Sequence, residues 1–154
     1  MLFQFEPQVN HVGMEATSAQ DAIRQIGEGL FRTGYVKESY VEAVLEREKN
    51  YPTGLPFEGA GIALPHTDAE HVMRPIIAIA TLKRTVPFQN MGDASQSVDT
   101  AIVVMLAMKN SEFQLTLLSR LIETLQDTAF VRELLAAESQ EALASKMSDK
   151  INGQ

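Results

Sequence analysis

Cysteine and tryptophan are absent from the 154-residue chain. Without cysteine the protein forms no disulfide bond and carries out no thiolate chemistry, and this composition suits a reducing compartment. Basic residues are outnumbered, with 13 Lys and Arg against 20 Asp and Glu, so the formal net charge is -7. The sequence therefore lacks the basic patch that binds a nucleic-acid backbone, and we expect no nucleic-acid partner.

Long apolar runs are also missing. The longest candidate, residues 100–108, is the size of a strand and far shorter than the roughly 18 residues of a membrane span. The N-terminus lacks the basic and apolar regions of a signal peptide. These features predict a soluble cytoplasmic protein without direct membrane insertion. The length predicts one domain over residues 1–154, able to bury roughly two thirds of its unfolded surface without a disulfide or metal.

Hydrophobic spacing in the first third predicts a strand followed by two helices. Residues 2–5 are a short apolar stretch typical of a strand, and residues 9–12 either extend it or begin a turn. Residues 17–18, Thr-Ser, are typical of a helix start, and apolar residues then recur at helical spacing up to a stop at Gly34. A second helix is expected over residues 37–49.

The middle of the chain has the composition of buried strands. Residues 52–56 contain two prolines and a glycine, which we expect to exclude regular structure. A short buried strand is predicted within residues 59–65. Residues 76–82 and 98–108 are apolar with little alternation, as in strands covered by helices on both faces. Between them, residues 87–93 are rich in turn formers and predict a linker.

The C-terminal third is expected to be helical. Ser111 is the predicted cap of a helix reaching about residue 127, residues 130–135 indicate a further short helix, and Ser139 is the predicted cap of the last one. The predicted order is thus β-α-α-β-β-β-α-α-α. This order favours an α/β fold, a three-layer α/β/α sandwich with a mixed β-sheet.

His66 is the main candidate for chemistry among the three histidines. It follows Pro65 at the end of a predicted buried strand, and strand ends in α/β sheets favour ligand sites. An imidazole with a pKa of about 6.5 is mostly neutral at pH 7, so it can act as a nucleophile or transfer a proton. The alternative is a histidine that only closes a strand end, and the local sequence leaves both interpretations open.

Arg47 and Gln114 are candidate anion ligands, each with a structural alternative. Arg47 lies at the margin of its helix's apolar stripe and offers planar donors that suit phosphate; alternatively, it pairs with a carboxylate or stabilises the helix C-terminus. Gln114 lies on the inward face of its helix. Either it completes a capping box with Ser111, or the helix start faces the site, where its amide and free backbone N–H groups meet an anion.

A metal centre is a third class of site to consider. His66, Asp68, Glu70 and His71 lie close together in sequence, and a metal hydrolase would use some of them. Their spacing matches neither a His-Glu-x-x-His motif nor a zinc finger. Nucleotide binding has little support either, because the glycines of residues 59–61 lack the third glycine of a dinucleotide motif and no Gly-Lys-Ser/Thr is present.

Several motifs, in order along nearly the whole chain, resemble those of one family. Residues 61–66, Gly-Ile-Ala-Leu-Pro-His, are similar to a Gly-x-Ala-x-Pro-His phosphorylation motif. The family is the IIA components of the sugar phosphotransferase system, fructose–mannitol type. The other similar segments are Tyr40 with Arg47-Glu48 in a helix, Val86-Pro87-Phe88 with Met91-Gly92 in a hairpin, and Leu115-x-x-Leu118-x-x-Leu121 in the next helix.

Three details resemble the galactitol-specific branch of this family. Residues 47–54, Arg-Glu-x-x-Tyr-Pro-Thr-Gly, are similar to its sequence, and so is His71, five residues after His66. Mannitol-type and nitrogen-regulatory relatives usually carry a second histidine where this chain has Gln114, whereas the galactitol type has glutamine. The resemblance thus points to galactitol or a related polyol as the transported sugar.

The resemblance implies that the chain is a phosphotransferase. His66 would accept a phosphoryl group from the phosphohistidine of HPr and pass it to a cysteine of the IIB component, with IIC reached through that complex. Arg47, Gln114 and Thr67 would stabilise the phosphoryl oxygens, and His71 is a secondary candidate. No metal or other cofactor is implied. Such transfer relies mostly on positioning and electrostatics.

The implied site is shallow, because two proteins dock on it in turn. Phe57, Leu64 and Met73 are the apolar residues expected to form its docking rim. An alternative function is a regulatory IIA-like protein that binds partners according to phosphorylation, with the phosphoryl charge as the switch.

Overall fold

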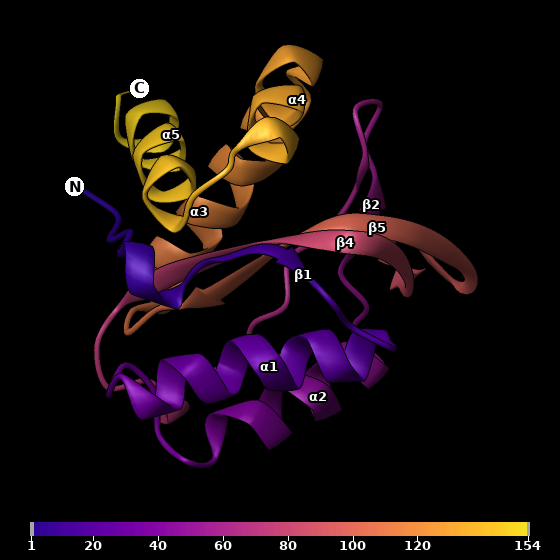
Figure 1. The fold of residues 1–154 in the computed structure, drawn as a ribbon. Helices are drawn as coiled ribbons and strands as arrows, with labels where there is room; N and C mark the ends of the chain where they lie inside the picture. The colour runs from indigo at the N-terminus through magenta and orange to yellow at the C-terminus, as the bar shows by residue number, and fades with distance from the viewer. Residues whose placement is uncertain (1, 154) are drawn as a thin grey trace.

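The computed structural model describes residues 2–153 and shows a mixed five-stranded sheet between two layers of helices (Figure 1). One face of the sheet is covered by two helices, α1 (Ala19–Arg32) and α2 (Tyr40–Asn50). The other face carries three, α3 (Ser111–Thr124), α4 (Thr128–Ala136) and α5 (Gln140–Asn152). The predicted three-layer α/β/α sandwich is confirmed.

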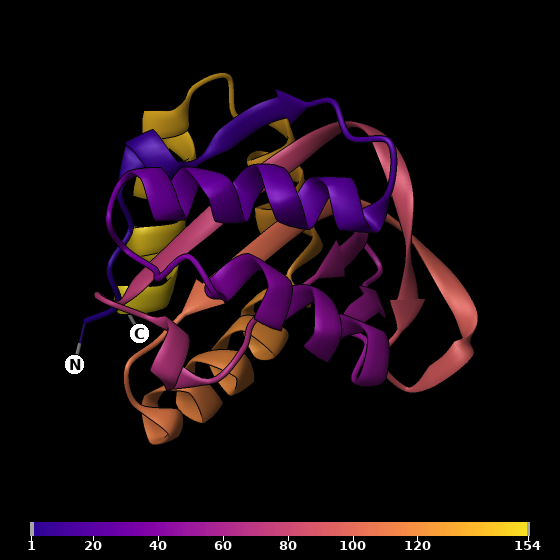
Figure 2. The same ribbon diagram turned by 90° about the horizontal axis from the view of Figure 1, so that it is seen from below.

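The strands are β1 (His11–Met14), β2 (Gly54–Pro56), β3 (Gly61–Ala63), β4 (Ile76–Asn90) and β5 (Asp93–Ala107). β1 runs parallel to β4, β4 antiparallel to β5, β5 parallel to β3, and β3 antiparallel to β2. Gly54 of β2 also pairs with Asn90 at the far end of β4. The β4–β5 hairpin extends beyond α1 and α2 (Figure 2).

Three details of the predicted strands are wrong. The first strand lies at residues 11–14 rather than 2–5, where only Phe5 forms an isolated bridge with the sheet. Residues 54–56 form β2, although we expected no regular structure there; the glycine permits a close approach to the backbone of residue 89, and the proline stands at the strand end. Residues 87–90 and 93 belong to the hairpin strands, so only residues 91–92 turn.

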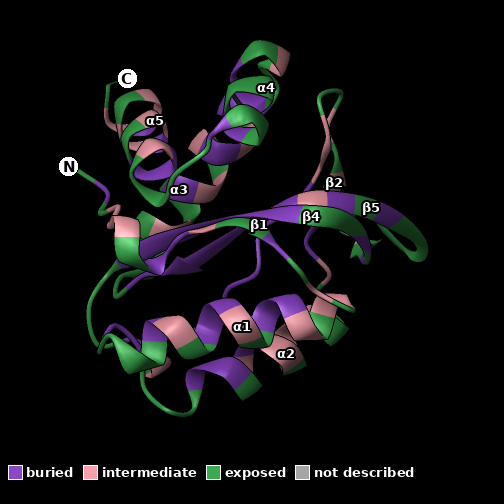
Figure 3. Cartoon of the chain, viewed as in Figure 1, coloured by how far each residue is buried: buried purple, intermediate pink, exposed green. Residues whose placement is uncertain are grey.

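Alternating side chains of the central strands supply two apolar cores, one on each face of the sheet. Ile76, Ala78 and Ala80 of β4 pack with α1 and α2, whereas Ile77 and Ile79 pack with the three C-terminal helices. The strand centres are therefore buried, whereas the hairpin tip is exposed (Figure 3). This confirms that the two long apolar segments are strands covered on both sides.

Two of the three predicted helix caps are confirmed. The hydroxyl of Ser18 accepts a bond from Asp21 N at 3.0 Å, and that of Ser139 accepts one from Ala142 N at 3.0 Å. At α3 the prediction is wrong by one residue. Asn110, not Ser111, is the cap, and its Oδ1 accepts bonds from the N–H groups of residues 112 and 113. Asparagine satisfies these donors as well as serine would.

Candidate functional site

His66 lies just after β3, where the chain continues alongside the end of β5. Leu106 N donates a 3.0 Å hydrogen bond to the carbonyl oxygen of Pro65, and His66 forms an isolated bridge with Leu106. Its side chain is held from within the same segment, because Nδ1 lies 2.8 Å from the carbonyl oxygen of Leu64. A carbonyl oxygen only accepts, so Nδ1 carries the hydrogen and the free lone pair of the neutral ring lies on Nε2.

The surroundings of His66 favour its neutral form. Only 7% of the residue is exposed. Burial is the largest cause that lowers its pKa, and the positive charge of Arg47 lowers it further. The bond to Leu64 and the negative charge of Asp68 act in the opposite direction but do not cancel the shift. The imidazole is therefore uncharged at pH 7, as a nucleophile must be.

Arg47 reaches the His66 site from the last turn of α2. Its Nη1 lies 3.8 Å from Asp68 Oδ1, and its guanidinium lies 5.3 Å from the centre of the Tyr51 ring. The carboxylate pairing anticipated as the structural alternative is therefore present. Among residues 2–153, however, Arg47 Nε is one of two buried side-chain atoms without a hydrogen-bond partner. A buried, unpaired N–H of a cation is suited to an anion.

Gln114 supplies the second of these atoms, its buried Oε1. The residue lies in the first turn of α3, on the same face as buried Leu117 and Leu121. A 180° rotation of the terminal amide places its NH2 group at the same position, so the unpaired group can serve as a donor. Because the cap is Asn110, the predicted capping box of Ser111 with Gln114 is wrong.

The backbone N–H groups at this helix start are largely occupied. Asn110 Oδ1 accepts from the backbone N of residues 112 and 113, and the carbonyl oxygen of Asn110 accepts from Gln114 N at 3.0 Å. The expectation of free N–H groups that meet an anion is therefore wrong for these three donors. The Gln114 side chain remains a candidate from α3.

The other two candidates occupy different surroundings. Thr67 is 5% exposed and directly follows His66. His71 lies beyond the next turn, where its Nδ1 is 2.8 Å from Ser39 Oγ and its Nε2 is 3.9 Å from Glu70 Oε1. Within the described chain, no three His, Cys, Asp or Glu side chains gather in a way that could hold a metal ion.

Two hydrogen-bonded links tie α2 to the segments around His66. At the start of the helix, Tyr40 Oη donates a buried 2.6 Å bond to the carbonyl oxygen of Leu106. At its end, both oxygens of Glu48 accept bonds from Thr53, and Thr53 Oγ1 accepts one from Leu64 N. The sequence alone gives Glu48 and Thr53 no role at the site, because a single side-chain hydroxyl joins α2 to the residue that follows β3.

One residue of the predicted docking rim is wrong, and the other two stay a prediction. Met73 is 55% exposed and Phe57 is half-buried, but Leu64 is fully buried, so its side chain cannot meet a partner protein. Leu64 instead packs in the core under the C-terminal helices.

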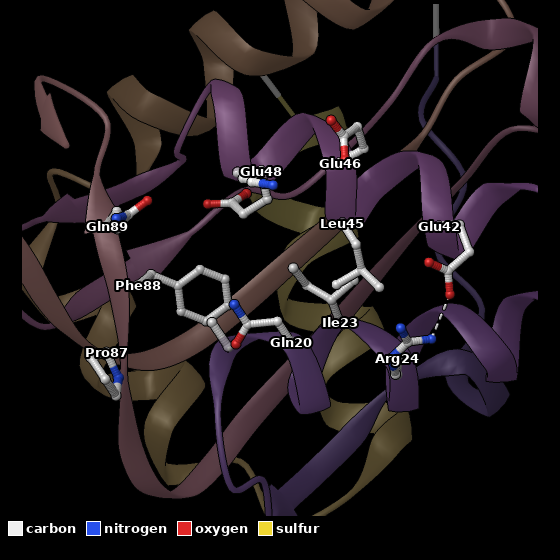
Figure 4. A pocket seen from close by; sticks show the side chains of 12 residues that line it. Gln20, Ile23, Arg24, Glu42, Leu45, Glu46, Glu48, Pro87, Phe88 and Gln89 are labelled. Carbon is white, nitrogen blue, oxygen red and sulfur yellow. Dashed lines mark hydrogen bonds and ion pairs between the residues drawn. The ribbon is translucent and has the colours of Figure 1, made fainter.

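A cavity of about 570 Å³ lies between α1, α2 and β4 (Figure 4). Its walls include Leu45, Glu48 and Phe88, and Arg24 forms an ion pair with Glu42 at one side of it. His66 is not among its lining residues.

No helix in the described part of the chain is both long and apolar enough to cross a membrane.

Comparison with known proteins places this arrangement in a family context. Residues 4–150 match the family model described as "Phosphoenolpyruvate-dependent sugar phosphotransferase system, EIIA 2". The galactitol-specific EIIA component of Escherichia coli K12 is 29% identical over 123 residues, which cover 80% of this chain and 81% of that protein. The transcriptional regulator ManR of Bacillus subtilis is 33% identical over 136 residues, 87% of this chain but only 19% of ManR.

Solved structures share the fold. The crystal structure of the mannitol IIA protein of Escherichia coli superimposes with a TM-score of 0.74 at 26% identity, over 94% of this chain and 99% of that one. The mannitol IIA protein in complex with phosphorylated enzyme IIB, also from Escherichia coli, has a TM-score of 0.73 at 25% identity, over 99% of this chain and 100% of that one. The chain therefore belongs to the EIIA 2 family of the sugar phosphotransferase system, whose domains are phosphotransferase components that transfer phosphoryl groups.

Proposed function

We propose that His66 carries a phosphoryl group, taken from the phosphohistidine of HPr and delivered to a cysteine of a IIB component. The observation that carries this proposal is the state of the imidazole. Its Nδ1–H is tied to the carbonyl oxygen of Leu64, which leaves the Nε2 lone pair available, and the unpaired Nε–H of Arg47 belongs to the same site.

The transfer consists of two displacements at phosphorus. In the first, the Nε2 lone pair of His66 forms a P–N bond while the P–N bond of the donor phosphohistidine breaks and its electron pair stays on the donor ring. In the second, a cysteine thiolate of IIB forms a P–S bond, and the P–N bond to His66 breaks with its pair returning to Nε2. The Leu64 carbonyl stabilises the positive charge that the phosphorylated ring carries on Nδ1–H.

The phosphoryl oxygens need donors rather than a base. Arg47 offers its guanidinium, Gln114 its amide and Thr67 its hydroxyl, and these groups act mainly by charge and position. Arg47 is the main contributor in this proposal, because a buried cationic N–H without a partner gains most from an arriving anion. His71 is a secondary candidate, since it is held by Ser39 and Glu70.

The docking face would be formed by exposed apolar side chains near the sheet end that carries His66. Met73 follows the His66 segment, and Phe113 and Leu115 flank Gln114 on α3; the three are 55%, 43% and 67% exposed. The same face would receive HPr and IIB in turn, in a weak and transient contact. IIC would be reached only through IIB. The complex of mannitol IIA with phosphorylated IIB supports this use of the fold.

For the sugar, we propose galactitol or a related polyol. The galactitol-specific EIIA component has nearly the same extent as this chain, which covers 81% of it. Mannitol-specific relatives include the EIICBA component of Vibrio cholerae, 36% identical over 115 residues, but the chain covers 16% of that protein. Glutamine at position 114 further favours the galactitol type in this proposal.

A regulatory role is the second candidate, and the similarity to ManR favours it. In that case the charge added at His66 would control binding to a partner instead of feeding a transporter. The chain spans about a fifth of ManR, so the similarity concerns one part of that regulator.

Labelling tests the proposal. The protein is incubated with phosphoenolpyruvate, enzyme I and HPr, and we expect acid-labile, base-stable phosphate. His66→Ala should abolish the label, whereas His11→Ala, which removes a histidine on β1, serves as the matched control and should keep it. Label on His66→Ala would show that the site is wrong. A galactitol-type IIB that discharges the labelled protein supports transport, and failure of several IIB proteins to do so favours the regulatory role.

A further inference from the structure

We infer that Glu48 and Thr53 are a positioning pair for His66. They fix the backbone of Leu64, and the carbonyl group of Leu64 in turn fixes the tautomer and orientation of the imidazole. The inference deepens the proposed function and rests on the role of His66 given there. Neither residue is placed to touch the phosphoryl group, so the pair acts through the histidine.

A continuous line of hydrogen bonds connects the carboxylate to the ring. Thr53 N and Thr53 Oγ1 donate to the two oxygens of Glu48, each at 2.8 Å. Leu64 N then donates to Thr53 Oγ1 at 3.1 Å. The carbonyl oxygen of Leu64 accepts the Nδ1–H of His66 at 2.8 Å.

The Glu48 carboxylate determines how the hydroxyl group of Thr53 is oriented. A hydroxyl has one hydrogen, and an ionised carboxylate can only accept. Thr53 Oγ1 must therefore give its hydrogen to Glu48 and turn a lone pair toward Leu64 N. Burial raises the pKa of the Glu48 carboxyl, and the two bonds from Thr53 offset part of that cost.

The Thr53 hydroxyl also extends the sheet by one step. β2 and β3 pair from Pro56 with Gly61 to Gly54 with Ala63, and the ladder then ends. The next two residues, Thr53 and Leu64, are joined by the hydroxyl instead of a backbone carbonyl. The Thr53 side chain thus holds the backbone N–H of Leu64, two residues before His66, beyond the last backbone pair of β2 and β3.

Position in the fold explains why Glu48 matters for the whole site. The residue follows Arg47 in α2, so the same anchor holds the last turn that carries the guanidinium. Tyr40 anchors the other end of α2 to Leu106, the bridge partner of His66. Glu48 itself lines the cavity between α1, α2 and β4 rather than the surface at His66 (Figure 4).

Removing the hydroxyl while keeping the side-chain shape tests the pair. Thr53→Val removes the hydroxyl partner of Leu64 N and of Glu48 Oε1 but keeps the backbone bond to Glu48 Oε2, whereas Thr53→Ser keeps the hydroxyl. We expect Thr53→Val to slow phosphorylation by phospho-HPr about tenfold or more, because small displacements of a reacting group are costly. Two-bond 1H–15N correlations of His66 should change from one tautomer to a mixture. The Thr53→Ser variant should keep the wild-type phosphorylation rate and the single His66 tautomer.

Thr81→Val is the matched control. Thr81 is 5% exposed, and its hydroxyl also accepts a backbone N–H, that of Gly13 at 3.0 Å on β1. Thr81→Val therefore removes the same kind of hydrogen bond, between a threonine hydroxyl and a backbone N–H, but between β4 and β1 instead of beside His66. We expect Thr81→Val to leave the rate and the His66 tautomer unchanged.

The outcomes separate this inference from the proposed function. A wild-type rate and an unchanged His66 tautomer in Thr53→Val would refute the positioning pair, while the loss of label in His66→Ala would still support the proposed function. A tautomer change in Thr53→Val, together with no label on the wild-type protein, would support the pair and refute the function. If Thr53→Val does not fold, Glu48→Gln replaces it, and an unchanged tautomer in that variant refutes the inference.

Discussion

Replacing Arg47 with alanine removes the group that, in this account, binds the phosphoryl oxygens most strongly. The variant loses a buried Nε–H that has no partner in the unphosphorylated protein. It also loses an ion pair with Asp68 at 3.8 Å, in which the two side chains are 37% and 71% exposed. The two losses affect different properties, because one concerns an arriving anion and the other the resting fold.

The magnitudes follow from these surroundings. A hydrogen bond to a charged group contributes about 1.5–3 kcal/mol, and each 1.4 kcal/mol changes a rate about tenfold, so transfer to His66 should slow by about 10- to 150-fold. A partly exposed ion pair contributes at most about 1 kcal/mol, so the free energy of unfolding should change little. Arg47→Lys keeps the charge but not the planar donors, and it should lie between alanine and wild type.

Initial rates of labelling by phospho-HPr at pH 8 are the assay. Arg47 lowers the pKa of His66, so its removal raises that pKa, and at pH 8 the imidazole stays neutral in both proteins. Arg24→Ala is the control, because it breaks the 2.7 Å ion pair of Arg24 with Glu42 away from His66. An Arg47→Ala rate within about threefold of wild type would refute the reasoning, since it corresponds to less than the weakest such bond.

Three further predictions concern the fold and the titration of the site. Tyr40→Phe leaves the carbonyl of Leu106 without its donor and should cost about 1–3 kcal/mol, seen as a lower urea midpoint with an unchanged slope. Gly61→Ala should cost about 3 kcal/mol or prevent folding, because a Cβ there overlaps a carbonyl oxygen of β5; Gly92→Ala, which has room, should unfold at nearly the wild-type midpoint. His66 should titrate by NMR below 6.5, so its contribution to stability is full above pH 6.5 and is lost as the pH falls through the folded pKa; titration above 6.5 would contradict its burial.

Much of the fold can be predicted because local chemistry and the final structure agree. Ser18 and Ser139 cap helices through their own hydroxyls, and the long apolar segments are buried on both faces. The strand at residues 54–56 could not be predicted, because its residues disfavour strands when taken alone. Gly54 is acceptable there only because the backbone of residue 89 packs against it, and that contact depends on the completed β4–β5 hairpin.

The sequence predicts the central residues of the candidate site, His66 and Arg47, but not the residues that hold them in place. His66 follows a strand and a proline, which marks it from the sequence, and Arg47 lies at the edge of an apolar stripe. Glu48 and Thr53 lie close together in the sequence, but the bond from Thr53 to Glu48 and the bond from Leu64 to Thr53 form only in the folded chain. The cap of α3 is Asn110 and not the predicted Ser111. Both residue types favour the cap position, so the sequence alone does not decide between two that are adjacent.

The role of His66 is best tested by identifying the atom that becomes phosphorylated. The protein is labelled with 15N, phosphorylated by phospho-HPr, and examined by 1H–15N correlation of its imidazole groups at alkaline pH. We expect only the signals of His66 to shift, with phosphorus coupled to Nε2 and the hydrogen retained on Nδ1. Phosphorus on Nδ1 of His66, on another histidine, or on no histidine would contradict it.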